Sequence, residues 1–243
     1  TVQLGKTVLK SKKNLIKSHK WRFLMQRMLD IFFSGLAIFC LSPLLLPIAC
    51  ILRITGEGEV FFIQNRVGRK SDQFGLIKFA TMLKDSPNIG TGEITINNDP
   101  RVLPLGKFLR KSKINELPQL WNILVGDMSV VGPRPMVPNT YANYPEKAQE
   151  ILNTVRPGLT GIGSIIFRDE ERLLDVHQDP IGFYNKNIAP YKSELEIWFV
   201  ENNSLWLYIK AIFVTAWVVI FPTSKIADIA FRGIPSLPES LKI

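Results

Sequence analysis

The segment IFFSGLAIFCLSPLLLPIACILRI, residues 31–54, decides how the chain is organised. Two serines and one arginine are its only departures from an apolar or small character, and its length suffices to cross a hydrocarbon core of roughly 30 Å. The run is broken at Ser42-Pro43 and again at Pro47. Because proline removes a helix hydrogen bond and clashes with the preceding turn, we expect a bent membrane helix in which the Ser42 hydroxyl satisfies a freed backbone group.

Basic side chains lie on both sides of this segment. They are Lys17, Lys20, Arg22 and Arg27 before it, and Arg53, Arg66, Arg69 and Lys70 after it. Since cytoplasmic flanks of membrane helices carry an excess of Lys and Arg, both ends are expected on the cytoplasmic side. A helix that enters the membrane, bends at Ser42-Pro43 and leaves by the same face satisfies this. The alternative, a straight span, places the basic arm outside.

Composition narrows the class of protein. With 243 residues, 46% of them hydrophobic, the chain has room for one folded domain and a membrane attachment. The formal charge of +9 includes a basic arm that precedes Asp30 and suits an anionic surface. Lipid is favoured over nucleic acid, because no zinc spacing, RNP-like aromatic pattern or helix-turn-helix accompanies the charge. Cys40 and Cys50 both lie in the apolar segment, which leaves no basis for a disulfide framework or cysteine metal cluster.

Beyond residue 56 the patterns predict a small α+β domain. The runs 60–63 and 74–79 are short and β-prone, and they flank a polar turn, which is typical of a β-hairpin. From Asn115 onward apolar residues recur at helical spacing, Pro118 falls in a tolerated first turn, and Asn115 is the predicted N-cap. Glu116 would then lie at a helix N-terminus, where free backbone N–H groups stabilise negative charge.

The rest of this domain is predicted as loops and helices. The stretch 86–100 has no helical period and indicates a loop, 144–155 indicates a helix, and 157–161 indicates a constrained loop. The segment 205–221 is apolar and aromatic but contains Lys210. We therefore expect an interfacial amphipathic helix there rather than a second span.

Several short motifs follow one another in a specific order and spacing. They are the kinked Ser42-Pro43 helix, VFFIQNRVG at 60–68, IKF at 77–79, GKFLR at 106–110, NELPQ at 115–119, GDMS at 126–129, GPRP at 132–135, RPG at 156–158 and TG at 160–161. Any one of them would be a weak signal. Together they resemble the bacterial sugar transferase family, the monotopic polyprenyl-phosphate phosphoglycosyl transferases, over roughly residues 20–219.

The resemblance implies a fold and a location. We expect an α+β monotopic protein of the bacterial inner (cytoplasmic) membrane, with a kinked re-entrant helix, interfacial amphipathic helices and a small catalytic domain facing the cytoplasm. The implied division is a basic N-terminal arm over 1–22, a re-entrant membrane helix-turn-helix over 23–55, a catalytic domain with interfacial helices over 56–222 and a C-terminal tail over 223–243.

The resemblance also implies a reaction. Such enzymes move a phosphosugar from a nucleotide diphosphosugar, here expected to carry UDP, onto polyprenyl phosphate and release the nucleoside monophosphate. They act through a covalent phosphosugar enzyme and a bound Mg²⁺. The expected partners are therefore the polyprenyl phosphate lipid, the nucleotide diphosphosugar and the membrane, without nucleic acid, and assembly into a homo-oligomer is left open.

Motif positions assign roles to individual residues. The implied catalytic pair is Asn115 and Glu116, with Glu116 also the metal ligand. An ionised carboxylate can attack phosphorus or hold magnesium. Cations are needed where anionic reactants meet. The candidates for binding the phosphates and the nucleotide are Lys78, Arg110, Arg134, Arg156 and Arg168, each of which could instead be a solvated or structural cation.

The most important departure from the family pattern is Asn115, which stands where the family has an aspartate nucleophile. A neutral amide is a poor nucleophile, so three accounts stay open. Glu116 attacks or shares the metal; or the asparagine is a disabling substitution; or the chain has lost the activity and is a catalytically silent membrane scaffold of the same fold.

Other departures concern phosphate and substrate binding. Ala80 stands where the family has an arginine after Phe79, so that one phosphate clamp is missing or replaced by Arg69 or Arg101. Glu196 stands where the family often has an aspartate. The stretch 163–171 also differs from the better-known pattern, and we expect sugar or base selectivity to differ there.

Overall fold

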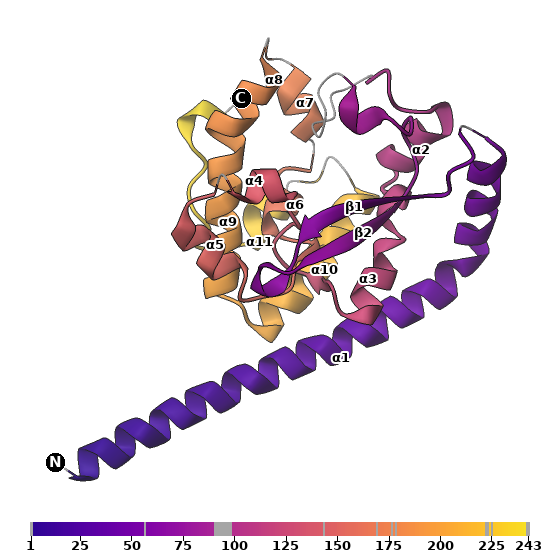
Figure 1. The fold of residues 1–243 in the computed structure, drawn as a ribbon. Helices are drawn as coiled ribbons and strands as arrows, with labels where there is room; N and C mark the ends of the chain where they lie inside the picture. The colour runs from indigo at the N-terminus through magenta and orange to yellow at the C-terminus, as the bar shows by residue number, and fades with distance from the viewer. Residues whose placement is uncertain are drawn as a thin grey trace.

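The fold combines one long N-terminal helix with a body of short helices and two small sheets (Figure 1). The computed structural model describes residues 2–55, 57–89, 99–142, 144–168, 170–175, 177, 179–221, 224 and 226–241. Side chains are described from residue 21 onward within these ranges, except at 87, 171, 172, 175, 181 and 228.

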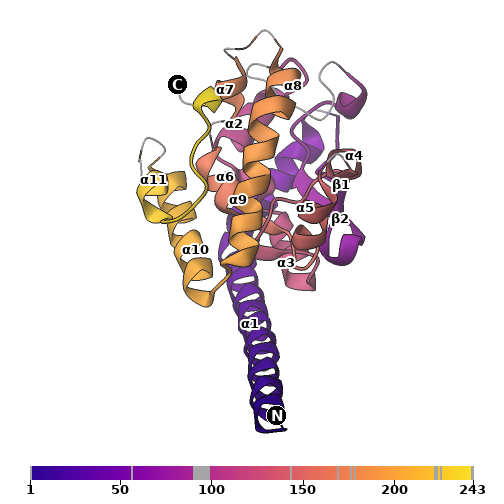
Figure 2. The ribbon, with the colours of Figure 1, turned by 90° about the vertical axis from the view of Figure 1, so that its left-hand side faces the viewer.

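Helix α1 (Val2–Ile54) projects from the body at its N-terminal end and curves around it at its C-terminal end (Figures 1 and 2). Pro43 and Pro47 both lie inside this helix. The Ser42 hydroxyl donates a 2.8 Å hydrogen bond to the Phe39 carbonyl, which is the group left without a donor by Pro43. The helix therefore bends without a break, and the predicted helix-turn-helix, which reverses at Ser42-Pro43, is not confirmed.

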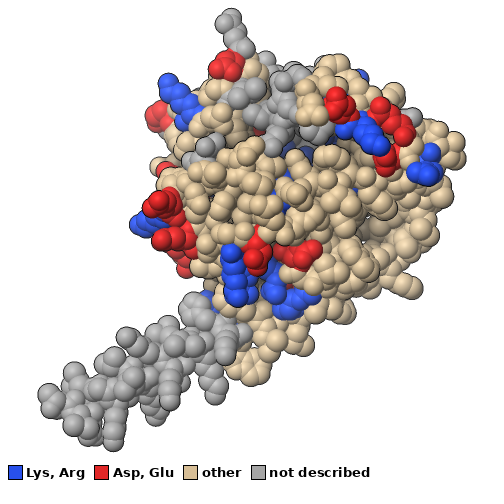
Figure 3. Space-filling view, in the orientation of Figure 1, with Lys and Arg blue, Asp and Glu red and all other residues tan. Residues whose placement is uncertain are grey.

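The apolar part of α1 is largely uncovered. Residues 21–54 are long and apolar enough to cross a membrane by length and composition, and this is the one such helix among the described residues. Figure 3 shows a mostly uncharged surface over the lower side of the body, where α1 curves, and Arg53 is the basic residue in the last turn of this helix. Large exposed apolar residues include Phe32, Leu36, Phe39, Leu46 and Ile54. This surface supports membrane association.

The predicted hairpin is confirmed. Strands β1 (Phe61–Val67) and β2 (Gln73–Phe79) are antiparallel, with Phe61 opposite Phe79 and Val67 opposite Gln73. Between them is the short 3-10 turn Arg69–Ser71. Lys70 and Ser71 have positive φ angles of 60° and 62°, which reverse the chain.

A second sheet, which the sequence did not predict, pairs β3 (Ser129–Val131) with β4 (Gly158–Thr160) in parallel. Residues 157–161, predicted as a constrained loop, therefore contain a strand. The two backbones pack so closely that a Cβ at Gly158 would lie 2.1 Å from the Gly132 nitrogen. Glycine is required by this close approach.

The remaining helices surround these sheets. They are α2 (Pro104–Lys111), α3 (Gln119–Val125), α4 (Pro138–Ala142), α5 (Glu146–Leu152), α6 (Ile162–Ile166), α7 (Glu170–Asp175), α8 (Pro180–Phe183), α9 (Ala189–Glu201), α10 (Leu205–Ile220) and α11 (Ile226–Ala230). A π turn (Tyr184–Ile188) precedes α9, and 3-10 turns lie at Ser86–Asn88, Ile114–Glu116 and Glu239–Leu241. Helix α5 confirms the helix predicted over 144–155, and the part of the predicted loop 86–100 at residues 90–98 lies outside the described residues.

Helix α10 confirms a helix within the predicted segment 205–221, with one face in the core and one exposed apolar face, and its interfacial position stays a prediction. Leu207, Ala211 and Val214 pack into the largest core cluster together with residues of α6 and α9. On the outward face, Trp206 and Phe213 are each more than two-thirds exposed. The inward face is thus a core face, which local periodicity alone did not indicate.

One turn of α1 is hydrogen-bonded to both α3 and β3. Arg27 donates hydrogen bonds to the carbonyls of Ile123 and Leu124 at the end of α3. Asp30, which is 1% exposed, accepts hydrogen bonds from β3 at 2.9 Å and 2.8 Å, from a serine hydroxyl and a backbone N–H respectively. These contacts fix α1 against the chain segments that carry the site described next.

Candidate functional site

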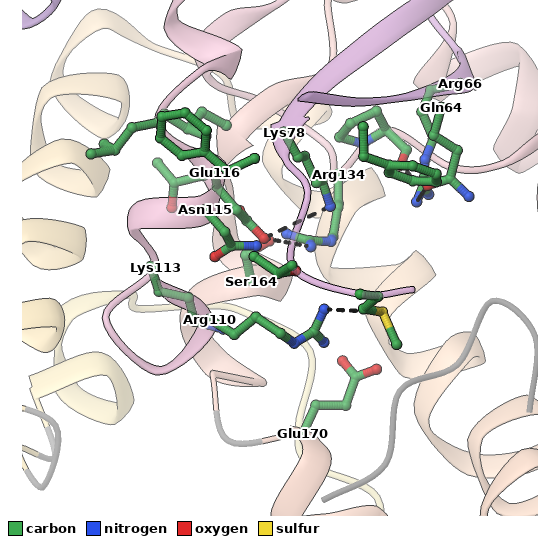
Figure 4. A pocket seen from close by; sticks show the side chains of 18 of the residues that line it. Gln64, Arg66, Lys78, Arg110, Lys113, Asn115, Glu116, Arg134, Ser164 and Glu170 are labelled. Atoms are coloured by element: carbon green, nitrogen blue, oxygen red, sulfur yellow. Dashed lines mark hydrogen bonds and ion pairs between the residues drawn. The ribbon is translucent and has the colours of Figure 1, made fainter. Parts of the chain in front are cut away.

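A cleft of about 1740 Å³ opens between the hairpin, α2, the 3-10 turn Ile114–Glu116, the loop after β3, α6, α9 and α10. Most of the predicted site residues line it, and Figure 4 shows the central ones pointing toward one another. The predicted residues in its lining are Lys78, Arg110, Asn115, Glu116, Arg134 and Arg168.

The chain brings Asn115 and Glu116 into the cleft by a tight turn instead of the predicted helix N-terminus. Lys113 has a positive φ of 59°, the 3-10 turn follows, and α3 begins only at Gln119 after Pro118. The predicted N-cap at Asn115 is therefore wrong. Asn115 lies inside the turn with 6% exposure. The charge on Glu116 must be stabilised by neighbouring side chains rather than by α3.

Two cations stabilise the Glu116 carboxylate. Its Oε1 atom lies 3.3 Å from Arg134 Nη2 and 3.9 Å from Lys78 Nζ. Burial by itself raises the pKa of this carboxyl, but the charges of Arg134, Lys78 and Lys113 together lower it to about 2. Glu116 is therefore ionised throughout the physiological pH range.

Lys78 is the most perturbed cation of the cleft. It lies on β2, and burial lowers its pKa to about 7, against the effect of Glu116. The charges of Arg134, Arg66 and Arg110 lower the pKa further. Four cationic side chains, those of Lys78, Arg134, Arg66 and Arg110, thus lie close enough to repel one another, with the Glu116 carboxylate as the central negative charge. An anion bound among them would relieve their mutual repulsion.

Arg110 and Arg168 approach the cleft from different elements. Arg110 is in the last turn of α2, and its Nη1 lies 3.8 Å from Met82 Sδ. Arg168 follows α6, and its Nη2 donates a long 3.5 Å hydrogen bond to the Val219 carbonyl. Its buried Nη1 has no hydrogen-bond partner among the described residues. Arg168 is thus placed to donate to a bound group.

Arg156 is the predicted phosphate-binding residue that the structure does not bring to the cleft. Its Nε donates a 2.7 Å hydrogen bond to the carbonyl of Gly126, just past the end of α3. Neither suggested replacement for the clamp missing at Ala80 lines the cleft either. Arg101 is buried in an ion pair with Asp99, and Arg69 donates to the Thr154 carbonyl.

Sequence reasoning overlooked several polar residues of the cleft. Arg66 points from β1 and donates to the Pro135 carbonyl at 3.1 Å. The two-residue alternation of the strand could have placed it on the same face as Gln64. Glu170 and Lys192 form a 2.5 Å ion pair on the opposite wall. Glu170 lies in the stretch 163–171, where selectivity is expected to differ, whereas no local pattern identifies Lys192, which comes from another helix.

The oxygen atoms of the central turn suit a divalent cation. Asn115 Oδ1 is buried without a hydrogen-bond partner in the described part of the chain, and the Glu116 carboxylate is adjacent in sequence. Among the described residues, no three or more His, Cys, Asp or Glu side chains are grouped so that they could hold a metal ion. Mg²⁺ usually binds through one or two carboxylates plus substrate phosphates, so these residues fit a metal shared with a phosphorylated ligand.

Comparisons with known proteins identify relatives of this chain. A family model described as bacterial sugar transferase matches residues 21–222. The chain is 34% identical over 201 residues to an undecaprenyl-phosphate glucose phosphotransferase of Komagataeibacter xylinus, covering 81% of this chain and 36% of that protein.

Two further relatives have names of the same kind. A UDP-N-acetylgalactosamine-undecaprenyl-phosphate N-acetylgalactosaminephosphotransferase of Aeromonas hydrophila is 31% identical, over 83% of this chain and 45% of that protein. A UDP-glucose:undecaprenyl-phosphate glucose-1-phosphate transferase of Klebsiella pneumoniae is 34% identical, over 79% of this chain and 39% of that protein. The chain thus spans less than half the length of these relatives.

Proposed function

The chain belongs to the bacterial sugar transferase family, and from this we propose that it transfers a phosphosugar from a UDP-sugar to polyprenyl phosphate. Uridine monophosphate is the released product. The relatives named as undecaprenyl-phosphate phosphotransferases of glucose or N-acetylgalactosamine support this reaction. It would be the first membrane step in the assembly of a bacterial glycan.

The observation that carries the proposal is the ionised Glu116 carboxylate held by Lys78 and Arg134 at the centre of a cationic cleft. A diphosphate brings negative charge that the surplus cations can neutralise. In the reaction, charge develops on the leaving uridine monophosphate, and fixed cations that surround it stabilise the transition state. Lys78, Arg110 and Arg134 are proposed for this role.

Glu116 is the proposed nucleophile in place of the family's aspartate. Both of its ion pairs are made through Oε1, and within the described residues no hydrogen bond to Oε2 is found. In the first step, Oε2 would attack the sugar-linked phosphorus as the phosphorus–oxygen bond to uridine monophosphate breaks. In the second step, an oxygen of polyprenyl phosphate would attack the same phosphorus and release the carboxylate.

Mg²⁺ is proposed as the cofactor, held by Glu116 and by the Asn115 amide oxygen. When bound, it would neutralise negative charge on the diphosphate. Asn115 itself would serve as an oxygen ligand and would help to fix the turn, without forming a covalent bond.

The proposed membrane topology rests on helix α1. We propose that its apolar surface lies in the bacterial inner membrane, with re-entry at the bend near Ser42-Pro43 and with the cleft facing the cytoplasm. The basic residues on both flanks and the uncovered apolar side chains support this. The exposed aromatic face of α10 suits the headgroup region, where tryptophan is favoured.

Asn115 favours a second candidate, a catalytically silent scaffold of the same fold. One experiment separates the two. Purified chain is incubated with undecaprenyl phosphate, Mg²⁺ and a panel of UDP-sugars, and release of uridine monophosphate is measured for the unaltered chain, Asn115→Asp and Glu116→Gln. Release by the unaltered chain that Glu116→Gln abolishes supports the proposal. Release only by Asn115→Asp identifies a disabling substitution, and silence of all three supports the scaffold.

A further inference from the structure

Buried oxygen atoms without hydrogen-bond partners gather at the walls of the cleft. In the part of the chain that the structure describes, they include Asn115 Oδ1, Ser164 Oγ and both carboxylate oxygens of Glu196. All three residues line the cleft, and Figure 4 places Ser164 beside Asn115. Native proteins leave few buried polar atoms unpaired. Such a concentration in one cleft indicates a site that binds a polar ligand.

Glu196 is the strongest member of this group. It lies on α9 with 6% exposure, and burial raises the pKa of its carboxyl to about 7 although Lys192 and Arg134 lower it. The backbone N–H groups of Arg134 and Gly163 lie near enough to lower this pKa slightly. Among the described residues, however, no donor reaches hydrogen-bonding geometry. A buried acid without a donor destabilises the folded chain unless a ligand compensates it.

The Glu196 carboxylate packs directly against two glycines. A Cβ at Gly163 would lie 2.7 Å from Glu196 Oε1, and a Cβ at Gly161 would lie 3.3 Å from Oε2. Gly163 and Glu196 are therefore a matched pair, because a side chain at 163 would displace the carboxylate. The absence of side chains at these glycines lets the buried carboxylate occupy this wall of the cleft.

We propose that Ser164 and Glu196 form the subsite that binds hydroxyl groups of the transferred sugar. This rests on the proposed function. Because its pKa is about 7, the Glu196 carboxyl exchanges near neutral pH between an ionised form, which only accepts hydrogen bonds, and a protonated form, which also donates one. A sugar hydroxyl both donates and accepts and therefore fits either form, whereas a phosphate only accepts and is repelled by the ionised form. Arg134 lies close enough to lower the pKa of both Glu116 and Glu196, so the sugar subsite adjoins the diphosphate site as a covalently joined sugar phosphate requires.

The test compares ligands with and without the sugar. Binding of UDP and of UDP-glucose, UDP-galactose and their N-acetylhexosamine counterparts to the full chain with Mg²⁺ is measured by calorimetry. The variants are Glu196→Gln and Ser164→Ala, with Glu194→Gln as the matched control on the exposed side of α9. The melting temperature of each ligand-free variant is recorded alongside.

The subsite predicts that Glu196→Gln weakens the UDP-sugar bound best by at least about 10-fold and changes UDP affinity less than about 2-fold. Ser164→Ala should act in the same direction. Neither should lower the ligand-free melting temperature, since neither side-chain oxygen has a partner to lose. Glu194→Gln should leave every affinity unchanged.

Several results would overturn the subsite. Equal weakening of UDP and UDP-sugar would assign Glu196 to the base or the phosphates, and a large drop in melting temperature would assign it a structural role. Unchanged affinities, or no binding of any UDP-sugar by the unaltered chain, would also reject it. Because binding needs no turnover, a chain that discriminates sugars but releases no nucleotide would reject the proposed function alone.

Discussion

The hydroxyl of Tyr208 in α10 donates a 2.5 Å hydrogen bond to Oδ1 of Asp30 in α1, and both side chains are only 1% exposed. The same oxygen accepts hydrogen bonds from Ser129 and from the backbone N–H of Val130. Three elements therefore meet at one carboxylate. Since β3 leads directly to Arg134, this contact joins the apolar helix to the cleft.

Replacing Tyr208 with Phe should destabilise the fold by about 1.5–3 kcal/mol, the usual range for a hydrogen bond to a charged group. Chemical denaturation of the purified chain measures this. Tyr141→Phe is the matched control, because its hydroxyl donates to a neutral carbonyl, that of Gln149, at 3.1 Å. The control should lose only about 0.5–1.5 kcal/mol. Equal losses would show that Asp30 does not serve as a buried charged anchor.

Lys78 should take up a proton when the donor binds above neutral pH. Its pKa is lowered from 10.5 to about 7, so at pH 8 most of the side chain is neutral in the empty cleft. A bound diphosphate favours the ammonium and raises the pKa. Calorimetry with UDP-glucose in buffers of different ionisation enthalpy should therefore detect proton uptake at pH 8, where Glu196, whose pKa is about 7, is already mostly ionised.

Lys78→Arg is the control for this proton uptake, because arginine stays charged throughout this pH range. It should bind without proton uptake at pH 8. If the unaltered chain takes up no proton at pH 8, Lys78 is either charged in the empty cleft or remote from the diphosphate.

Arg156→Ala should lower stability while leaving donor affinity within about 2-fold. The substitution removes the Nε donor to the Gly126 carbonyl, and a partly buried acceptor left unpaired costs about 1–3 kcal/mol. Denaturation and UDP-glucose binding are measured on the same preparation. A loss of affinity of about 10-fold or more without a loss of stability would return Arg156 to the phosphate-binding role that its motif position suggested.

The sequence predicted those features that local patterns or ordered motifs determine. Alternating β-prone runs around a polar turn predicted the hairpin, and motif order identified Lys78, Arg110 and Arg134, which the fold then brings into one cleft. The sequence also predicted that the Ser42 hydroxyl bonds to a backbone group freed by proline, because a proline inside a helix leaves a carbonyl without its donor. The hydrogen bond to the Phe39 carbonyl confirms this.

Features that depend on contacts distant in sequence could not be predicted. Strands β3 and β4 have three residues each, too few for periodicity, and pair across Ser129 and Gly158. The position of Arg156 among the ordered motifs suggested phosphate binding, but it did not indicate where the side chain points. The start of α3 was placed too early, because Asn115 carries a capping residue type while the left-handed Lys113 imposes a separate turn.

The central claim is that the phosphosugar, and not the sugar alone, moves to the lipid. The most direct test uses UDP-sugars carrying ³²P in the β-phosphate, incubated with the full chain, undecaprenyl phosphate and Mg²⁺ and then partitioned between butanol and water. We expect label in the lipid phase, unlabelled uridine monophosphate in the water, and loss of both in Glu116→Gln by about 100-fold or more. Label that stays in the water, as released UDP or as unreacted donor across the panel, would contradict it.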